Sequence, residues 1–147
     1  MRFTPKSEKE INEEKLLPEG DYPFEISGAE NATSKKGNPM IKITVRVYKP
    51  NGQFILVTDY LMEAMLYKLL HCCQACGLED QYNKGALDPE MFIGKTGMLK
   101  LKIDPESDYP AKNSIKDYIK DAAKVVLPKD GLTKVLDNDL ESDSIPF

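Results

Sequence analysis

Residues 40 to 60 read MIKITVRVYKPNGQFILVTDY, and this stretch decides the fold. Apolar and polar side chains alternate from Met40 to Tyr48, which predicts a half-buried β-strand with one face in the core and a basic, aromatic face outside. The segment Lys49-Pro50-Asn51-Gly52 predicts a tight turn, and residues 54 to 60 read as the returning antiparallel strand. The sequence therefore places a β-hairpin at the centre of the fold.

The flanking segments add three more strands and one helix to this hairpin. Residues 22 to 26 alternate before it, and Gly28 indicates a bulge or a sharp bend. After the hairpin, apolar residues at three- and four-residue intervals predict one amphipathic helix with its C-cap at Gly77. The residues expected on the core side of this helix are Met62, Met65, Leu66, Leu69, Leu70 and Cys73. Two further strands are expected at residues 96 to 103 and, more weakly, 114 to 120.

The order of these elements is three strands, one helix and two strands. It matches the five-stranded Greek-key barrel of the OB-fold, an all-β architecture in which the helix between strands 3 and 4 covers one end. Closing the sheet is favourable because an open sheet of short strands leaves edges exposed. Periodicity alone also allows the alternative, an open sheet packed on the helix.

The charge of the chain is unevenly distributed, with a net value of −4. The last eleven residues contain four acidic side chains and no Lys or Arg, so the rest of the chain has as many basic as acidic residues. We therefore divide the chain into a polar N-terminal arm at 1–15, an OB-fold domain at 16–127 and a flexible acidic tail at 128–147.

The cysteines and the single histidine do not predict a metal site. Cys72, Cys73, Cys76 and His71 belong to one short helix, from which four ligands cannot converge, so we expect buried thiols and no metal. Such crowded cysteines are not a secreted disulfide framework, and no apolar run is long enough to cross a membrane, so we expect a cytoplasmic protein. Neither a phosphate loop nor a nucleophile with its base is recognisable, which predicts no enzyme and no cofactor.

The outer face of the central hairpin carries candidate nucleic-acid contacts. A protein that binds single strands needs cations along the phosphates and rings on which bases stack. Lys42, Arg46 and Tyr48 share one face at two-residue spacing, whereas we expect Phe54 to pack in the core or at the barrel end. The complete set of candidate contacts is Lys35, Lys36, Lys42, Arg46, Tyr48, Tyr60, Lys100, Lys102, Tyr109 and Lys112. For any one lysine, a solvated surface position is the competing interpretation.

The chain ends DNDLESDSIPF, residues 137 to 147. This ending resembles the C-terminal tip of bacterial single-stranded DNA-binding proteins, where an acidic stretch precedes Ile-Pro-Phe, although the acids here are spread further upstream. A terminal Phe offers a ring and a carboxylate to a pocket with an apolar floor and a basic rim. The resemblance implies that the tail binds replication, recombination or repair proteins through Asp139, Glu141, Asp143, Ile145, Pro146 and Phe147.

The body also resembles small phage-encoded OB-type single-stranded DNA-binding proteins, over roughly residues 16 to 120. The similar segments are PEGDY at 18–22, SKKGNPMI at 34–41 and DYL at 59–61. This resemblance implies a protein of an infected bacterial host cell that coats and protects single-stranded DNA in replication, recombination or repair, without sequence preference. Assembly into a homo-oligomer is left open. The alternatives are an adaptor or inhibitor that imitates the tip without binding nucleic acid, and a binder of RNA or duplex DNA.

Overall fold

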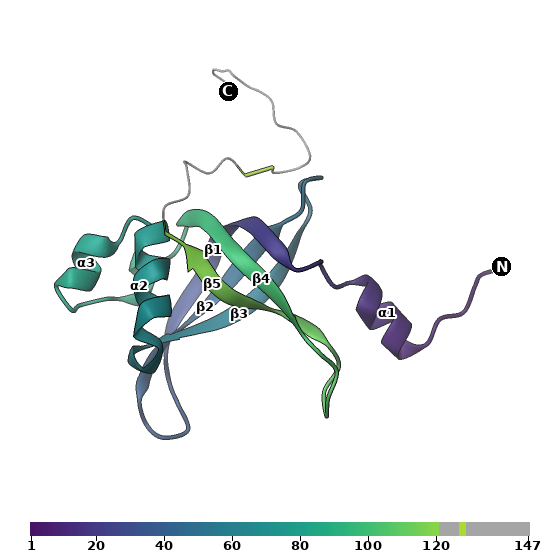
Figure 1. Cartoon of the computed structure of the whole chain (residues 1–147), viewed down its shortest axis with the longest axis horizontal. Helices are drawn as coiled ribbons and strands as arrows, with labels where there is room; N and C mark the ends of the chain where they lie inside the picture. The colour runs from purple at the N-terminus through teal and green to yellow at the C-terminus, as the bar shows by residue number, and fades with distance from the viewer. Residues whose placement is uncertain (121–126, 129–147) are drawn as a thin grey trace, which may run out of the picture.

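A computed structural model describes residues 1–120 and 127–128 of the chain. Five strands and a few short helices account for its regular structure (Figure 1). In chain order they are α1 (Glu8–Glu14), β1 (Gly20–Thr33), β2 (Pro39–Tyr48), β3 (Phe54–Met62), the 3-10 turn η1 (Glu63–Met65), α2 (Leu66–Ala75), α3 (Glu79–Asn83), the 3-10 turn η2 (Pro89–Met91), β4 (Thr96–Asp104) and β5 (Lys112–Ile119).

The five strands form one antiparallel sheet in the order β3-β2-β1-β4-β5. β1 is the longest strand and lies in the middle, paired with β2 along one edge and with β4 along the other. The two edge strands, β3 and β5, also contact each other, so the sheet curves around its apolar face. The predicted all-β class with one main helix is confirmed.

The core is built from one face of every strand, as the alternation predicts. Ile43, Val45 and Val47 of β2 are fully buried, together with Phe24 and Ile26 of β1. Gly28 marks the expected bulge, because the pairing of β1 with β2 shifts register between Ile26 and Gly28.

The predicted helix is present but starts later and faces differently. It begins with η1, and α2 then runs to a C-cap at Cys76, after which Gly77 takes the left-handed conformation with φ of 75°. The Leu78 N–H donates to the Cys73 carbonyl, which completes the Gly-terminated cap. Met65 and Leu66 are exposed, so their predicted place in the core is wrong. Cys73 is buried as expected, and Cys72 and the C-cap residue Cys76 are buried with it.

β5 also departs from simple alternation. The two-residue period predicts Ile115 and Ile119 inward, but Ile115 and Tyr118 are the buried pair. The register between β4 and β5 shifts between Lys100 and Leu101, so no residue of β4 pairs with Lys116. The residues of β5 that follow Lys116 therefore face the opposite side of the sheet from the one that alternation predicts.

The N-terminal arm contains a helix that stands away from the sheet (Figure 1). Ser7 caps α1 in a reciprocal arrangement with Glu10, and the Asn12 amide donates to the Ala111 carbonyl beside β5. The loop that follows α2, which the sequence marks only by turn residues, contains α3 and η2. Among the described residues, no helix is long and apolar enough to cross a membrane.

Candidate nucleic-acid interface

The outward-facing side chains of β2 and β3 form a surface that we call the β2–β3 face. The register of the two strands sets their order, because each outward residue of β2 lies opposite one of β3. From one end to the other, the pairs are Lys42 with Tyr60, Thr44 with Thr58, Arg46 with Leu56 and Tyr48 with Phe54.

The two rings that this face exposes are Phe54 and Tyr60, with exposed fractions of 44% and 42%. Two predictions are therefore corrected. Phe54 does not pack in the core, and Tyr48 is only 3% exposed, so its ring is not open for stacking. The Tyr48 ring packs against Phe54 of β3 with 5.6 Å between centroids, and its hydroxyl donates to Glu25 Oε1 of β1 at 3.2 Å.

Arg46 is held between a ring and a carboxylate. Its guanidinium carbon lies 5.1 Å from the centroid of the Phe54 ring, and its Nη1 lies 3.6 Å from Glu25 Oε1. Since the same Glu25 oxygen accepts from Tyr48, four side chains from three adjacent strands form one cluster. This cluster orients a planar cation on a planar ring, an arrangement that suits flat, anionic ligands.

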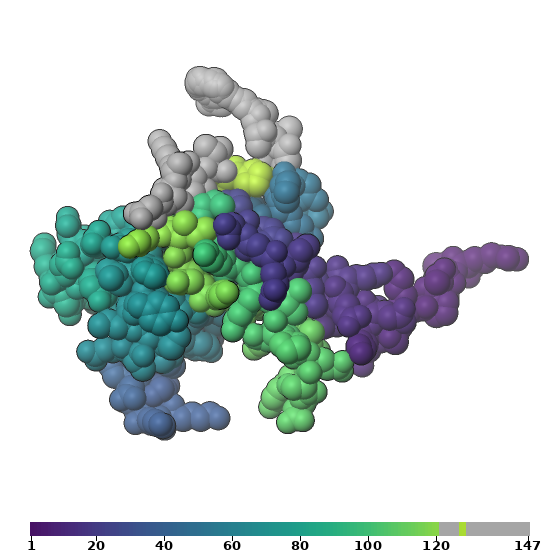
Figure 2. Space-filling view, in the orientation of Figure 1, coloured from purple at the N-terminus to yellow at the C-terminus, as the bar shows by residue number. Residues whose placement is uncertain are grey.

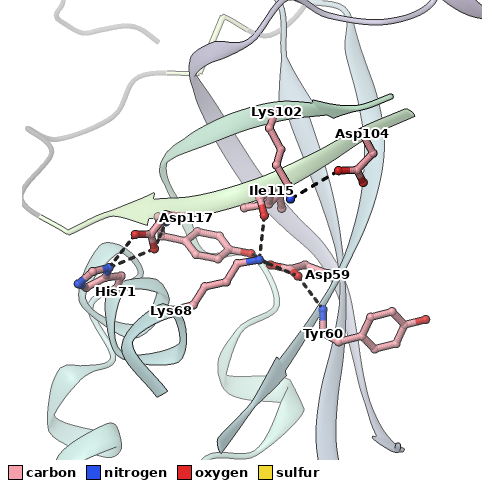
Figure 3. A network of polar contacts seen from close by, with 9 residues as sticks. Asp59, Tyr60, Lys68, His71, Lys102, Asp104, Ile115 and Asp117 are labelled. Atoms are coloured by element: carbon pink, nitrogen blue, oxygen red, sulfur yellow. Dashed lines mark hydrogen bonds and ion pairs between the residues drawn. The ribbon is translucent and has the colours of Figure 1, made fainter. Parts of the chain in front are cut away.

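Behind the other end of the face lies Asp59, which alternates with Tyr60 and points to the opposite side of β3 (Figure 3). Asp59 accepts from the Tyr60 backbone N–H at 2.9 Å and from the Tyr118 hydroxyl at 2.7 Å, and Lys68 Nζ lies 3.2 Å away. Burial, with the nearby Cys72 and Asp59, raises the pKa of Tyr118 well above its usual value, so the hydroxyl stays protonated and donates. Figure 3 shows the Tyr60 ring pointing away from these groups.

This network joins β3, α2 and β5, and it holds the backbone at Tyr60 in place. Lys68 of α2 also donates to the Ile115 carbonyl of β5, at 2.8 Å. Nearby, His71 Nδ1 lies 3.0 Å from the Asp117 carboxylate, a second link between α2 and β5. The sequence does not predict this role of Asp59, because its partners lie on segments distant along the chain.

The remaining predicted contacts do not all lie on the β2–β3 face. Lys100 and Lys102 lie on β4, which β1 separates from β2, and they line a hollow with Asp21 and Lys116. Lys102 Nζ is also 3.5 Å from Asp104. The structure therefore splits the predicted cationic path into two areas.

Two exposed turns carry the other four predicted contacts. Lys35 and Lys36 lie in the β1–β2 turn, whose Gly37 has a φ of 87°. Tyr109, the most exposed ring of the described residues, and Lys112 belong to the β4–β5 hairpin. Figure 2 shows both turns projecting from the lower side of the molecule, in blue and in green, on either side of the body.

All three cysteines are buried and free of disulfides. Burial raises the pKa of Cys73 to about 12 and that of Cys72 well above its usual value, so neither is a thiolate near neutral pH. The predicted partner-binding residues of the tail, 139 to 147, lie outside the described residues.

Sequence reasoning underrated Phe54 and missed Leu56, although a signal was present. The returning strand alternates, so Phe54, Leu56, Thr58 and Tyr60 had to share one face, and the inward face was already supplied by Val57 and Leu61. The chain matches no known family model and no curated protein, so the functional assignment depends on this geometry and on the sequence patterns.

Proposed function

We propose that the protein binds single-stranded DNA without sequence preference, through the β2–β3 face of an OB-fold barrel. The strand order, the contact between β3 and β5, and the helix between β3 and β4 support this fold assignment. In OB-folds, the face of strands 2 and 3 and the loops beside it bind oligonucleotides. The β1–β2 turn and the β4–β5 hairpin are the corresponding loops here.

The observation that carries the proposal is the spacing of rings and cations on this face. Phe54 and Tyr60 are exposed on β3, while on β2 Lys42 lies directly opposite Tyr60 and Arg46 lies opposite Leu56, one pair away from Phe54. Stacking tolerates every base, since each base has a π-face, and a cation beside each ring can contact the adjoining phosphate. No pattern of donors and acceptors for reading base edges is needed for this mode of binding.

The wider role follows from the two resemblances in the sequence. In this proposal the protein coats and protects single-stranded DNA during phage replication, recombination or repair in a bacterial host. The acidic tail that ends Ile145-Pro146-Phe147 recruits the enzymes that act on the coated strand. Flexible acidic segments suit this task, because they can engage different basic pockets in turn.

The experiment is a titration of fluorescein-labelled oligothymidylate of about 30 nucleotides, a length that exceeds the site size of most OB-folds. Anisotropy of a label is preferable to intrinsic fluorescence, because the chain has no Trp. We expect Phe54→Ala and Tyr60→Ala each to weaken binding by roughly fivefold to a hundredfold, which corresponds to the loss of ~1 to 3 kcal/mol per stacked base.

Tyr67→Ala is the matched control, because Tyr67 is an exposed tyrosine on α2, outside the β2–β3 face. It should leave binding unchanged. If the wild-type protein shows no affinity for oligothymidylate in dilute buffer, the proposed function is wrong. If all three substitutions changed the affinity equally, the binding surface would not be the β2–β3 face. An affinity for RNA or duplex equal to that for single-stranded DNA would support the broader nucleic-acid alternative.

A further inference from the structure

We infer that Glu25 and Glu30 of β1 make the β2–β3 face selective for unpaired polynucleotides over duplexes, because they neutralise its two cations. This inference rests on the proposed function and names two specificity-determining residues that sequence reasoning did not include. The observation behind it is that both predicted cations of the face already have a carboxylate partner.

The two ion pairs are set by strand register. Glu25 lies directly opposite Arg46 and Glu30 directly opposite Lys42 in the pairing of β1 with β2. Their charged atoms are 3.6 Å and 3.7 Å apart. Facing positions of adjacent strands hold their Cβ atoms about 5 Å apart, so the register keeps each acid within reach of its cation.

Because the two cations are paired with acids, they contribute less electrostatic free energy to the binding of a phosphate. A phosphate that approaches Lys42 must displace Glu30 or share the ammonium group with it, so the local net charge that it meets is near zero. Binding a phosphate then releases few of the counterions that otherwise drive association with DNA. Stacking on the Tyr60 ring and on the exposed part of the Phe54 ring, which Arg46 and Tyr48 also contact, does not depend on that charge balance.

Selectivity follows from this difference between charge and rings. A duplex offers phosphates at high density but keeps its bases stacked inside, so it gains little from a charge-balanced face. A single strand can turn its bases onto the rings. Two uncompensated cations would raise the affinity for both ligands, and more so for the duplex, which depends on phosphates alone.

The test uses Glu30→Gln, which removes one charge from a side chain that is 68% exposed and therefore leaves the fold intact. Glu25→Gln is the second variant and keeps an oxygen that can accept from Tyr48. Asp80→Asn, an exposed acid on α3, makes the same change in net charge away from the face. Each variant is titrated with labelled oligothymidylate and with a blunt duplex of equal length, across a series of NaCl concentrations.

For Glu30→Gln we expect single-strand affinity to rise roughly two- to fivefold, the range of an exposed ion pair. The slope of log K against log salt should steepen by about 0.7, the value for one more phosphate contact on a single strand. Affinity for the duplex should rise by a larger factor, so that the preference for single strands falls. Asp80→Asn should change none of the three quantities.

The outcomes separate this inference from the proposed function. If the wild type binds oligothymidylate but Glu30→Gln and Glu25→Gln behave like Asp80→Asn, the acids do not set selectivity and only the inference is wrong. Weaker single-strand binding by both variants would also overturn it, since the acids would then be supporting the contacts. If the wild type binds neither ligand, the proposed function and the inference fail together.

Discussion

Replacing Asp59 with alanine should cost about 3 kcal/mol of unfolding free energy, because this carboxylate joins the two edge strands to α2. Removing one partner of a buried ion pair typically costs ~3 to 5 kcal/mol, since the other charge is left without compensation. The side chains of Lys68 and Asp59 are 12% and 13% exposed, so water reaches them slightly. The Ile115 carbonyl still accepts from Lys68 after the change, which places the cost near the lower bound.

Urea unfolding followed by circular dichroism measures this effect. With a denaturant slope of ~1 to 3 kcal/mol per M, the midpoint of the Asp59→Ala variant should fall by roughly 1 to 3 M. Lys68→Met supplies the other side of a double-mutant cycle. In that background the cation is gone, and Asp59→Ala should cost at least ~1 kcal/mol less than it does alone.

The cycle can also refute the reasoning. If the two substitutions add to within ~0.5 kcal/mol, Asp59 and Lys68 are not coupled, and the ion pair between them does not account for the lost stability. Asp59→Asn is the matched control for the hydrogen bonds. The amide oxygen of the substituted side chain can still accept from the Tyr118 hydroxyl, so the unfolding free energy of this variant should lie between those of the wild type and the alanine variant.

Three other predictions follow from packing, burial and the tail. Gly97→Ala should lose ~1 to 3 kcal/mol by urea unfolding, because a Cβ there would lie 2.9 Å from the buried Phe24 ring. The thiol of Cys73 stays protonated in the folded protein, whereas in the unfolded chain it loses its proton above the usual pKa of 9.0. Raising the pH from about 8 to about 10 should therefore lower the urea midpoint, and should lower it less in Cys73→Ala. Deleting residues 137 to 147 should preserve or tighten oligothymidylate binding by anisotropy while abolishing capture of DNA-processing enzymes in pull-downs; retained capture would exclude the tail as the recruiting segment.

The parts of the fold that the sequence predicted are those that local physics decides. The hairpin at residues 49 to 53 needs a positive φ at Gly52 and the end of α2 needs one at Gly77, while the bulge occurs beside Gly28. Alternation of polar and apolar side chains then assigned the two faces of β2 and β4 correctly, since one face of each is buried. In each case the requirement lies within a few residues of the signal.

The parts that the sequence did not predict depend on neighbours distant along the chain. Tyr48 alternates outward with Lys42 and Arg46, yet it is covered by Phe54 from β3 and held by Glu25 from β1. Tyr118 is buried because β5 changes register, which no property of the residues from 114 to 120 reveals. The ion pairs of Glu25 and Glu30 could be predicted only once the pairing of β1 with β2 was known.

The charge balance of the face also bears on how many protomers would occupy one strand of DNA. A chain with a net charge of −4 does not attract a polyanion from beyond the screening length of ~10 Å, and the cations of the face are paired at close range. In the proposed binding mode, stacking on Phe54 and Tyr60 would supply ~2 to 6 kcal/mol, which is less than the ~8 kcal/mol of a micromolar site. Tight occupancy therefore requires contributions beyond the two rings, either from the β1–β2 turn and the β4–β5 hairpin or from neighbouring protomers. A face of this kind suits coverage of long strands by many copies better than capture of a short oligonucleotide by one.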